Sequence, residues 1–325
     1  MLDKTIIIAG ITGFIGEALS SRFLSGNYRL KGFTRSLEKA RKLEKQGIEP
    51  ILWDGHSLTG WEKQLEGTAA LIDLTGENIA SGRWSQEKKN KILNSRVESG
   101  SILTEALRRV NTGPGVYVQA SAIGLYGACG DIELDERSPA GKGFLAQVVK
   151  QWEASSDGVE SLGWRRIICR FGVVLGRDGG VLKRMIVPFR WLMGGAIGSG
   201  QQWMSWIHID DLARAIEFLI SREACRGIFN CTAPHPVRNR EFARALGHVL
   251  HKPAFIAVPA WVLKILLGEM AEQVLLSGQQ AVPYRLAKTG FTFRFPYLEE
   301  ALKDLLKMKK TAAVTGDTGT SPGDL

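Results

Sequence analysis

Short apolar runs alternate with stretches of helical periodicity through the first half of the chain. Thr5–Ala9 is a run of mostly β-branched apolar residues, and the amphipathic residues 17–24 follow it after a short turn. The same alternation predicts further strands at residues 28–34, 49–53, 69–74, 115–120 and 165–175, and helices at residues 37–46, 86–111 and 144–156. This rhythm predicts a parallel sheet with helices on both faces, a doubly wound α/β fold.

The rhythm changes in two glycine-rich segments, residues 176–180 and 194–200, which are typical of turns. Beyond them the pattern predicts a strand edge with a helix, one more sheet strand and two helices, at residues 207–222, 227–231, 240–250 and 261–276. The second half is therefore expected to complete the sheet and then to become mainly helical.

These patterns predict two structural units and a tail. Residues 1–175 plus about 206–233 are expected to form a nucleotide-binding sheet domain. Residues of about 176–205 plus 234–305 are expected to form a smaller, mainly helical domain, with a ligand in the cleft between the two. Residues 310–325 are rich in Gly, Ser and Thr without an apolar period, which predicts a disordered tail.

Three glycines, Gly10, Gly13 and Gly16, join the first predicted strand to the first predicted helix. In a strand–turn–helix unit, the first glycine permits the tight turn, the second lets backbone approach phosphates, and the third lets helix pack on strand. The helix N-terminus offers free N–H groups to an anion, so residues 10–16, with Thr12, Phe14 and Ile15, predict a dinucleotide site. Their spacing is G-x-x-G-x-x-G, whereas most dehydrogenases have G-x-G-x-x-G.

The choice of dinucleotide depends on the end of the second strand. An acid there would bind the ribose 2′-hydroxyl of NAD, but this strand ends at Arg35, whose guanidinium can fork onto a 2′-phosphate. NADPH is therefore predicted to be preferred over NADH, unless Arg35 is only a surface residue. Asp54 either caps the adenine amino group or closes a turn with Gly55, and the sequence favours neither.

Composition excludes several other classes. The net charge is +9, but the basic residues are interleaved with acids, as in residues 39–45, which is typical of a solvated helix face rather than a nucleic-acid stripe. No apolar run approaches the roughly 20 residues of a membrane helix. The four cysteines lack metal-type spacing, so we expect no metal site and reduced thiols. Because the N-terminus leads directly into the first strand, we expect no signal peptide and a cytoplasmic protein.

Several motifs resemble those of the extended short-chain dehydrogenase/reductases, which include the sugar-nucleotide epimerases and dehydratases. They are the glycine turn at residues 10–16, the segment 120–127 and the segment 206–213. The chain is most similar to an atypical subgroup of epimerase family proteins, also described as cell-division-inhibitor-like. The marks of this subgroup are found at residues 74–79, 83–84, 95–96, 188–190, 194–200, 229–230, 236–239 and 267–269. Together the motifs cover about residues 4–305.

This resemblance implies a Rossmann fold of the extended type and an NADP-binding, epimerase/dehydratase-like oxidoreductase acting on a small molecule. The implied NADP contacts, besides the glycine turn, are Thr34, Arg35, Leu74, Thr75, Lys91, Arg96 and Val174. Leu74 and Thr75 also follow the fourth strand at the point where such sheets bind the cofactor. Whether the chain forms a homodimer stays open.

The catalytic pair of the resembled family is missing. In its active members a tyrosine four residues before a lysine acts as the acid/base, but here Phe144 and Val148 occupy these positions. The position of the catalytic hydroxyl falls on Ala122, next to Ser121. The remaining candidates, each favoured as structural rather than catalytic, are Ser121, Tyr126, Lys142, Lys150 and His208.

Two functions therefore remain. The first is an NADP-dependent oxidoreductase with an unidentified substrate and a different proton donor. The second is a catalytically silent NADP(H)-binding regulatory or scaffold protein, in cell division or organelle biogenesis. Arg170, a charge in the apolar run 165–175, is expected to pair with Asp210 or Asp211, with a substrate role as the alternative.

Overall fold

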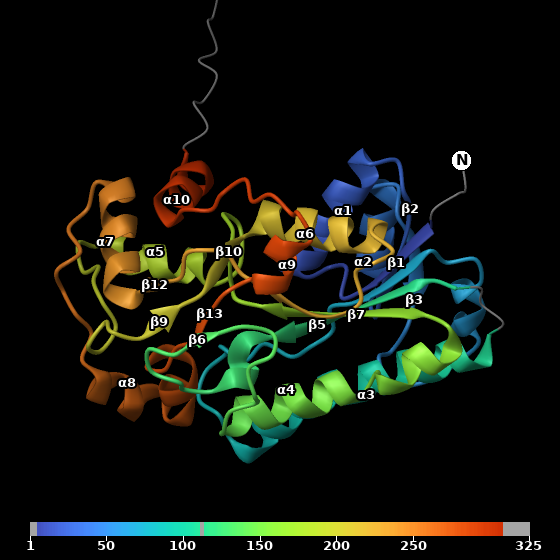
Figure 1. Ribbon diagram of the computed structural model, residues 1–325, viewed down its shortest axis with the longest axis horizontal. Coiled ribbons are helices and arrows are strands. Elements are labelled where there is room, and N and C mark those ends of the chain that lie inside the picture. The colour runs from blue at the N-terminus through green and yellow to red at the C-terminus, as the bar shows by residue number, and fades with distance from the viewer. Residues whose placement is uncertain (1–4, 111–113, 308–325) are drawn as a thin grey trace, which may run out of the picture.

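Within the described residues, a parallel sheet of seven strands forms the centre of the molecule, in the order β11-β7-β5-β4-β1-β2-β3 (Figure 1). The computed structural model describes residues 5–110 and 114–307. The strands are β1 (Thr5–Ala9), β2 (Arg29–Thr34), β3 (Glu49–Leu52), β4 (Ala70–Asp73), β5 (Val116–Ala122), β7 (Arg165–Phe171) and β11 (Gly227–Cys231). The strand order reverses between β1 and β4, and in doubly wound sheets the ligand binds at the carboxyl ends of such strands.

Helices cover both faces of this sheet, as Figure 1 shows. On one face lie α1 (Phe14–Ser25), α2 (Leu37–Lys45) and α6 (Ile209–Ser221), and on the other lie α3 (Gln86–Arg109) and α4 (Phe144–Ala154). Alternate residues of β1 serve the two faces, because Ile6 and Ile8 join the core under α1 and α6, whereas Ile7 and Ala9 join the core under α3. A strand buried on both faces is apolar throughout. The predicted doubly wound α/β fold is confirmed.

A third core lies beside the sheet, among α5 (Leu182–Arg190), α7 (Asn239–Leu250) and α10 (Leu298–Leu306) (Figure 1). Trp206 and Phe242 are both fully buried in it. The remaining strands and helices are β6 (Glu133–Leu134), β8 (Val173–Leu175), β9 (Trp203–Met204), β10 (Trp206–His208), β12 (Val237–Arg238), β13 (Gln280–Ala281), α8 (Ala260–Leu267) and α9 (Tyr284–Lys288). The division into two domains stays a prediction, and the predicted tail at 310–325 lies outside the described residues.

The strand predicted at residues 165–175 is wrong as a single element. It breaks at Gly172 into β7, which pairs with β11, and β8, which pairs with β10. A Cβ on Gly172 would lie 2.6 Å from the carbonyl oxygen of Ser205, so only glycine lets the two segments approach this closely. The chain therefore leaves the central sheet here and turns toward the third core.

The helix predicted at residues 261–276 is also wrong in its length. The helix α8 ends at Leu267, because Gly268 has φ +59°, and a single π-helical turn, Ala271–Leu275, follows it. Neither α8 nor any other helix within residues 5–110 and 114–307 has the length and hydropathy required to cross a bilayer. The segment after Gly268 instead turns back toward α4.

Candidate functional site

The turn between β1 and α1 lies against the end of β4. Gly10 has φ +82°, and a Cβ on it would lie 2.9 Å from the backbone oxygen of Leu74. A Cβ on Gly16 would lie 2.5 Å from the carbonyl oxygens of Gly10 and Ile11. In this described segment Gly13 precedes α1 without a side-chain cap, so the first N–H groups of the helix keep no side-chain partner. This glycine cradle fits a dinucleotide, whose pyrophosphate binds to such N–H groups.

The side chain of Phe14 packs away from this cradle, against the glycine-rich break at residues 176–180. A Cβ on Gly176, Gly179 or Gly180 would lie 2.3, 2.4 or 2.9 Å from the nearest ring atom of Phe14. The break is therefore glycine-rich because the ring occupies the space of three side chains. Phe14 can contribute to a nucleotide site through its backbone N–H.

The segment after β2 carries the residues expected to choose between dinucleotides. The Thr34 hydroxyl is buried and accepts a hydrogen bond from the Ser36 N–H at 3.4 Å. Arg35 is exposed and forms no ion pair within residues 5–110 and 114–307. Thr12 lines a cavity of about 580 Å³ together with Lys39 and other residues of α1 and α2. Arg35 thus keeps its charge available to a ligand phosphate.

Asp54 closes a turn, and its contact with an adenine amino group stays a prediction. Its carboxylate accepts hydrogen bonds from the backbone N–H of His56 at 2.8 Å and of Ser57 at 2.9 Å, and from the Ser57 hydroxyl at 2.6 Å. These bonds, the hydroxyl first, lower the pKa of Asp54 to about 2. The carboxylate is therefore ionised and fixed in orientation by the turn.

At the end of β4, Asp73 is fully buried. Its carboxylate accepts from the Thr75 N–H at 2.9 Å and from the Thr75 hydroxyl at 2.5 Å, and the Tyr117 hydroxyl lies 3.4 Å away. Burial outweighs these bonds and raises the pKa of Asp73 to about 6. Thr75 is thus held by Asp73, with Leu74 between them at the edge of the sheet.

Replacing Asp73 by asparagine is expected to flatten the dependence of stability on pH. The folded protein binds the Asp73 proton more tightly than the unfolded chain, so the free energy of unfolding falls as pH rises from about 4 to about 6 and then levels off. The fall is about 3 kcal/mol. Asp73→Asn is expected to remove it, because the amide oxygen still accepts from Thr75. Urea unfolding of both proteins across this range measures the effect, and equal slopes would contradict it.

Arg96 of α3 is the cation nearest in the fold to this strand end. A Cβ on Gly76 would lie 2.9 Å from its Cζ, and its guanidinium lies 5.0 Å from the centre of the Trp152 ring. It donates to the carbonyl oxygen of Ile92 at 2.9 Å but forms no ion pair within the described part of the chain. Burial lowers its pKa to about 10. A desolvated cation that forms no ion pair is suited to binding an anionic ligand.

Two of the implied cofactor contacts lie on other elements, Lys91 on the surface of α3 and Val174 in β8, where its backbone oxygen and the Phe14 ring both approach Gly180. Lys91 is exposed and forms an ion pair with Glu87 at 2.5 Å, one turn back on α3. Val174 lies in β8 and is paired with Ile207 of β10, beyond the break at Gly172. The structure brings together the glycine turn, Leu74, Thr75 and Arg96, and it leaves Lys91 in a surface ion pair.

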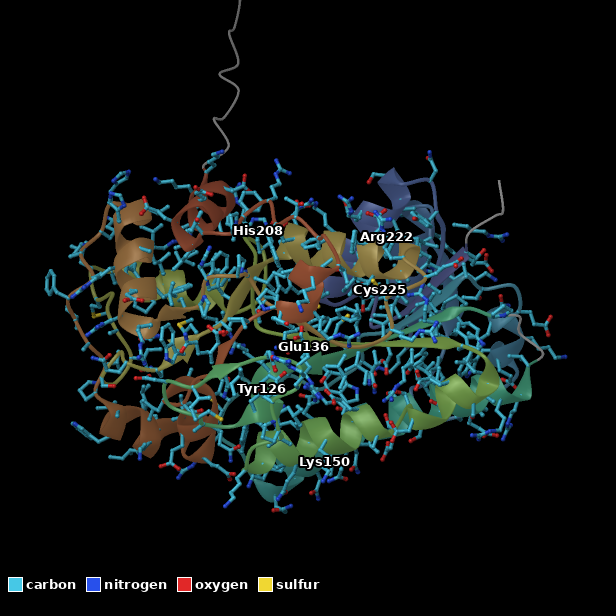
Figure 2. All side chains as sticks on the ribbon, viewed as in Figure 1. Tyr126, Glu136, Lys150, His208, Arg222 and Cys225 are labelled. Atoms are coloured by element: carbon cyan, nitrogen blue, oxygen red, sulfur yellow. The ribbon has the colours of Figure 1, made fainter. Side chains whose placement is uncertain are left out.

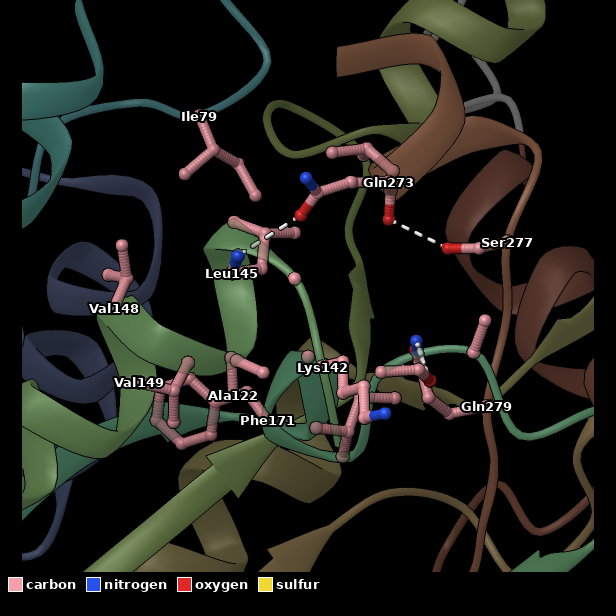
Figure 3. Close-up of a pocket in the computed structure, with 18 of the residues that line it drawn as sticks. Ile79, Ala122, Lys142, Leu145, Val148, Val149, Phe171, Gln273, Ser277 and Gln279 are labelled. Carbon is pink, nitrogen blue, oxygen red and sulfur yellow. Dashed lines mark hydrogen bonds between the residues drawn. The ribbon is translucent and has the colours of Figure 1, made fainter. Parts of the chain in front are cut away.

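A cavity of about 430 Å³ adjoins Arg96 (Figure 3). Ala122 at the end of β5, Val148 of α4 and Phe171 at the end of β7 form one wall, and residues 272–279 contribute to another. Phe144 instead packs its ring edge-on against Trp84, with 5.2 Å between ring centres. The positions of the missing acid/base pair are therefore occupied by apolar packing at and beside the wall of this cavity.

The proton-donor candidates lie mostly outside the cavity. The Ser121 hydroxyl is buried and donates to Glu153 at 2.5 Å. The Tyr126 hydroxyl donates to Asn230 at 2.8 Å, and burial raises the pKa of Tyr126. Lys150 is exposed on α4, on the side away from Tyr126 (Figure 2). His208 caps α6 and stacks on Phe295, with 4.0 Å between ring centres. Of these five candidates, all of which the structure describes, only Lys142 lines the cavity.

The expected partner of Arg170 is wrong. Its guanidinium makes a two-pronged contact with Glu153, with Nε and Nη2 each 2.8 Å from a carboxylate oxygen, and Nη1 donates to the Tyr126 hydroxyl at 3.1 Å. Asp211 instead accepts the backbone N–H groups of residues 294 and 295. Sequence reasoning missed Glu153, although it is an acid four residues from the buried Val149 on the inner face of α4.

Comparisons with known proteins agree with this architecture. Residues 6–232 match the model of the NAD dependent epimerase/dehydratase family, and residues 258–305 match a domain of unknown function (DUF1731). The chain is 38% identical over 307 residues to the epimerase family protein SDR39U1 homolog, chloroplastic, of Arabidopsis thaliana, covering 94% of this chain and 87% of that protein. It is 33% identical over 307 residues to the epimerase family protein YfhF of Bacillus subtilis, covering 94% and 99%.

A solved structure is similar over the same extent. The crystal structure of the human epimerase family protein SDR39U1 (isoform2) with NADPH superposes with a TM-score of 0.82 at 33% identity, covering 93% of this chain and 98% of that one. The expected resemblance to the extended epimerases and dehydratases is confirmed, whereas the cell-division-inhibitor-like subgroup stays a prediction. The chain belongs to the NAD dependent epimerase/dehydratase family.

Proposed function

We propose that this protein binds NADP(H) along the carboxyl edge of β1, β2 and β4 and acts as an oxidoreductase on a small molecule in the adjoining cavity. The observation that carries the proposal is the pair of arginines, Arg35 and Arg96, beside an uncapped helix N-terminus. Neither arginine forms an ion pair within the described residues. The NADPH in the human relative's structure supports the same choice of cofactor.

The residues present divide the work of holding such a cofactor. The first turn of α1 would hold the pyrophosphate, Arg35 the 2′-phosphate, and Arg96 a further anionic oxygen. When bound, NADP(H) supplies or accepts a hydride. Ala122 and Val148 keep this part of the cavity wall apolar. The titratable side chains of the described lining are Arg96, Lys142 and Glu272, so the accompanying proton is expected to come from solvent or from Lys142.

Reversing the charge of Arg35 is expected to weaken NADPH binding selectively. An arginine–phosphate contact contributes about 1.5 to 3 kcal/mol, so Arg35→Asp should raise the Kd of NADPH by roughly 10- to 100-fold. The Kd of NADH should change by less than about 3-fold. Arg41→Asp is the matched control, because Arg41 is also exposed and lies on α2. Fluorescence titration measures both cofactors, and equal affinities in the parent would overturn the preference.

A silent NADP(H)-binding regulatory protein is the second candidate, and Phe144 and Val148 favour it. Turnover separates the two. An oxidoreductase should change the nicotinamide absorbance with some member of a panel of carbonyl compounds and nucleotide sugars. Tight NADPH binding with no change across the whole panel would support the silent protein instead.

We also propose that the protein works in a reducing compartment, with the cytoplasm as the expected one. Its four cysteines are free in the structure, and three of them are buried. Free thiols need no oxidising environment. Rapid alkylation of the protein at cell lysis, followed by mass measurement, should find all four as thiols, and an oxidised pair would count against this compartment.

A further inference from the structure

The polar side chains Gln273, Ser277 and Gln279 on the far wall of the cavity each make a hydrogen bond within the protein. Gln273 accepts from the Leu145 N–H at 3.1 Å and donates to Glu269 at 2.6 Å. Ser277 donates to the carbonyl oxygen of Gln273 at 2.8 Å, and Gln279 donates to that of Gly127 at 2.8 Å. Figure 3 shows two of these bonds at the edge of the cavity. Each of these side chains is thus held by a bond within the protein, and only its remaining donor and acceptor positions are open to a ligand's hydroxyls.

The rest of the lining is largely apolar. Its apolar side chains come mainly from α4, from the ends of β5 and β7, from β8 and from the π-helical turn, and they include Ala122, Leu145, Val148, Phe171, Val173 and Val274. A cavity of about 430 Å³ lined in this way gains affinity by burying hydrocarbon. It penalises a polyhydroxylated ligand, because each buried hydroxyl without a partner costs about 1 to 3 kcal/mol.

Lys142 is a charged residue within this largely apolar lining. It lines the cavity just before α4, and Figure 3 shows it between Ala122 and Gln279. Within the described residues its ammonium forms no ion pair or hydrogen bond, whereas Glu272, which also lines the cavity, is paired with Lys264 at 2.8 Å. The cavity thus combines an apolar wall with one uncommitted cation besides Arg96.

We propose that this cavity binds a small, mostly apolar carboxylate, with the acid group on Lys142 and the hydrocarbon along the α4 wall, and that it does not bind a sugar nucleotide. The proposal rests on the proposed function in assigning Arg96 to the cofactor. With Arg96 so occupied, one cation remains, which is enough for a carboxylate but not for a diphosphate with its sugar. Lys142 is then a residue that determines specificity.

Calorimetric titration of the full chain tests this with three probes: octanoate, octanamide and UDP-glucose. Octanoate is expected to bind, octanamide to bind at least 10-fold more weakly, and UDP-glucose not to bind in the cavity. Lys142→Gln should weaken octanoate about 10-fold and leave octanamide unchanged, as expected for loss of one charge-assisted contact. Lys150→Gln is the matched control, because Lys150 is exposed on α4 outside the cavity and should change neither.

A second variant guards against unspecific binding to exposed apolar side chains such as Trp191 and Phe255. Leu145→Trp fills the cavity and should abolish octanoate binding, which unspecific binding would survive. The titrations are run with and without NADP⁺, whose own Kd is measured first and should not change in Lys142→Gln. If NADP⁺ did not bind, the proposed function would be wrong, but the carboxylate site would not be contradicted. Tighter binding of UDP-glucose than of octanoate, no octanoate binding, or equal effects of the two lysine variants would overturn the carboxylate site.

Discussion

Replacing Glu153 by methionine is expected to destabilise the fold by about 3 to 5 kcal/mol, since it leaves a buried charge unpaired. The side chains of Glu153 and Arg170 are 13% and 5% exposed, and their contact is two-pronged. The variant removes both carboxylate acceptors of Arg170 and the acceptor of the Ser121 hydroxyl at once, and within the described residues it leaves Arg170 only the Tyr126 hydroxyl as an acceptor. A neutral side chain of similar length keeps the packing of α4 against the sheet, so the loss reports the charge.

The partner variant distinguishes an unpaired charge from lost packing. Arg170→Met alone should also destabilise, but the double variant Glu153→Met with Arg170→Met should recover part of the loss, because no charge then remains buried. The free energies of unfolding in urea for the four proteins complete the cycle. Additive losses in the double variant would show that Glu153 and Arg170 contribute independently, and would contradict this account.

The surroundings of this ion pair show what Ser121 and Tyr126, two candidates for catalysis on sequence grounds, do in the fold. Both stand on the segment that carries the catalytic hydroxyl in the resembled family, and both have hydroxyl groups. In the fold each hydroxyl donates inward, Ser121 to Glu153 and Tyr126 to Asn230. Their chemistry is that of a buried hydrogen-bond network that ties α4, β5, β7 and β11 together.

The elements that sequence reasoning located well are those specified by local pattern. Thr5–Ala9 and Gly227–Cys231 are strands with the predicted bounds, because each is a short apolar run closed by turn residues. The glycine turn at residues 10–16 could be predicted for the same reason, since the backbone there excludes any Cβ at Gly10 and Gly16. The fold class follows from such units in sequence.

What the sequence could not show depends on contacts between distant residues. The break at Gly172 is set by Ser205, which lies more than thirty residues away, just before β10, and no local pattern pairs β10 with β8. Glu153 could not be chosen over Asp210 or Asp211 as the partner of Arg170, because all three are acids near apolar helical faces. The far wall of the cavity likewise comes from residues 272–279, which a longer predicted helix would have placed elsewhere.

Replacing Val148 by the lysine of the resembled family is expected to destabilise the fold rather than to restore catalysis. Val148 is 3% exposed and packs with Trp84, Ile92 and Met270. A lysine there must either lose its proton or stay as a buried charge without a partner. Lowering a lysine pKa by about 3 units costs about 4 kcal/mol at neutral pH. Val148→Met, which stays apolar, should cost less than about 1.5 kcal/mol.

The pH dependence of the free energy of unfolding shows whether the buried charge causes the loss of stability in Val148→Lys. Because the folded state of Val148→Lys binds the lysine proton less tightly than the unfolded chain, its deficit relative to Val148→Met should shrink as pH rises toward about 10. Urea unfolding across this range measures it, and a deficit independent of pH would indicate overpacking instead. Phe144→Tyr, at a half-buried position, should by contrast be tolerated. The lysine position has thus become part of an apolar cluster with Trp84 and Met270, so any proton donor in this protein must come from a different part of the cavity.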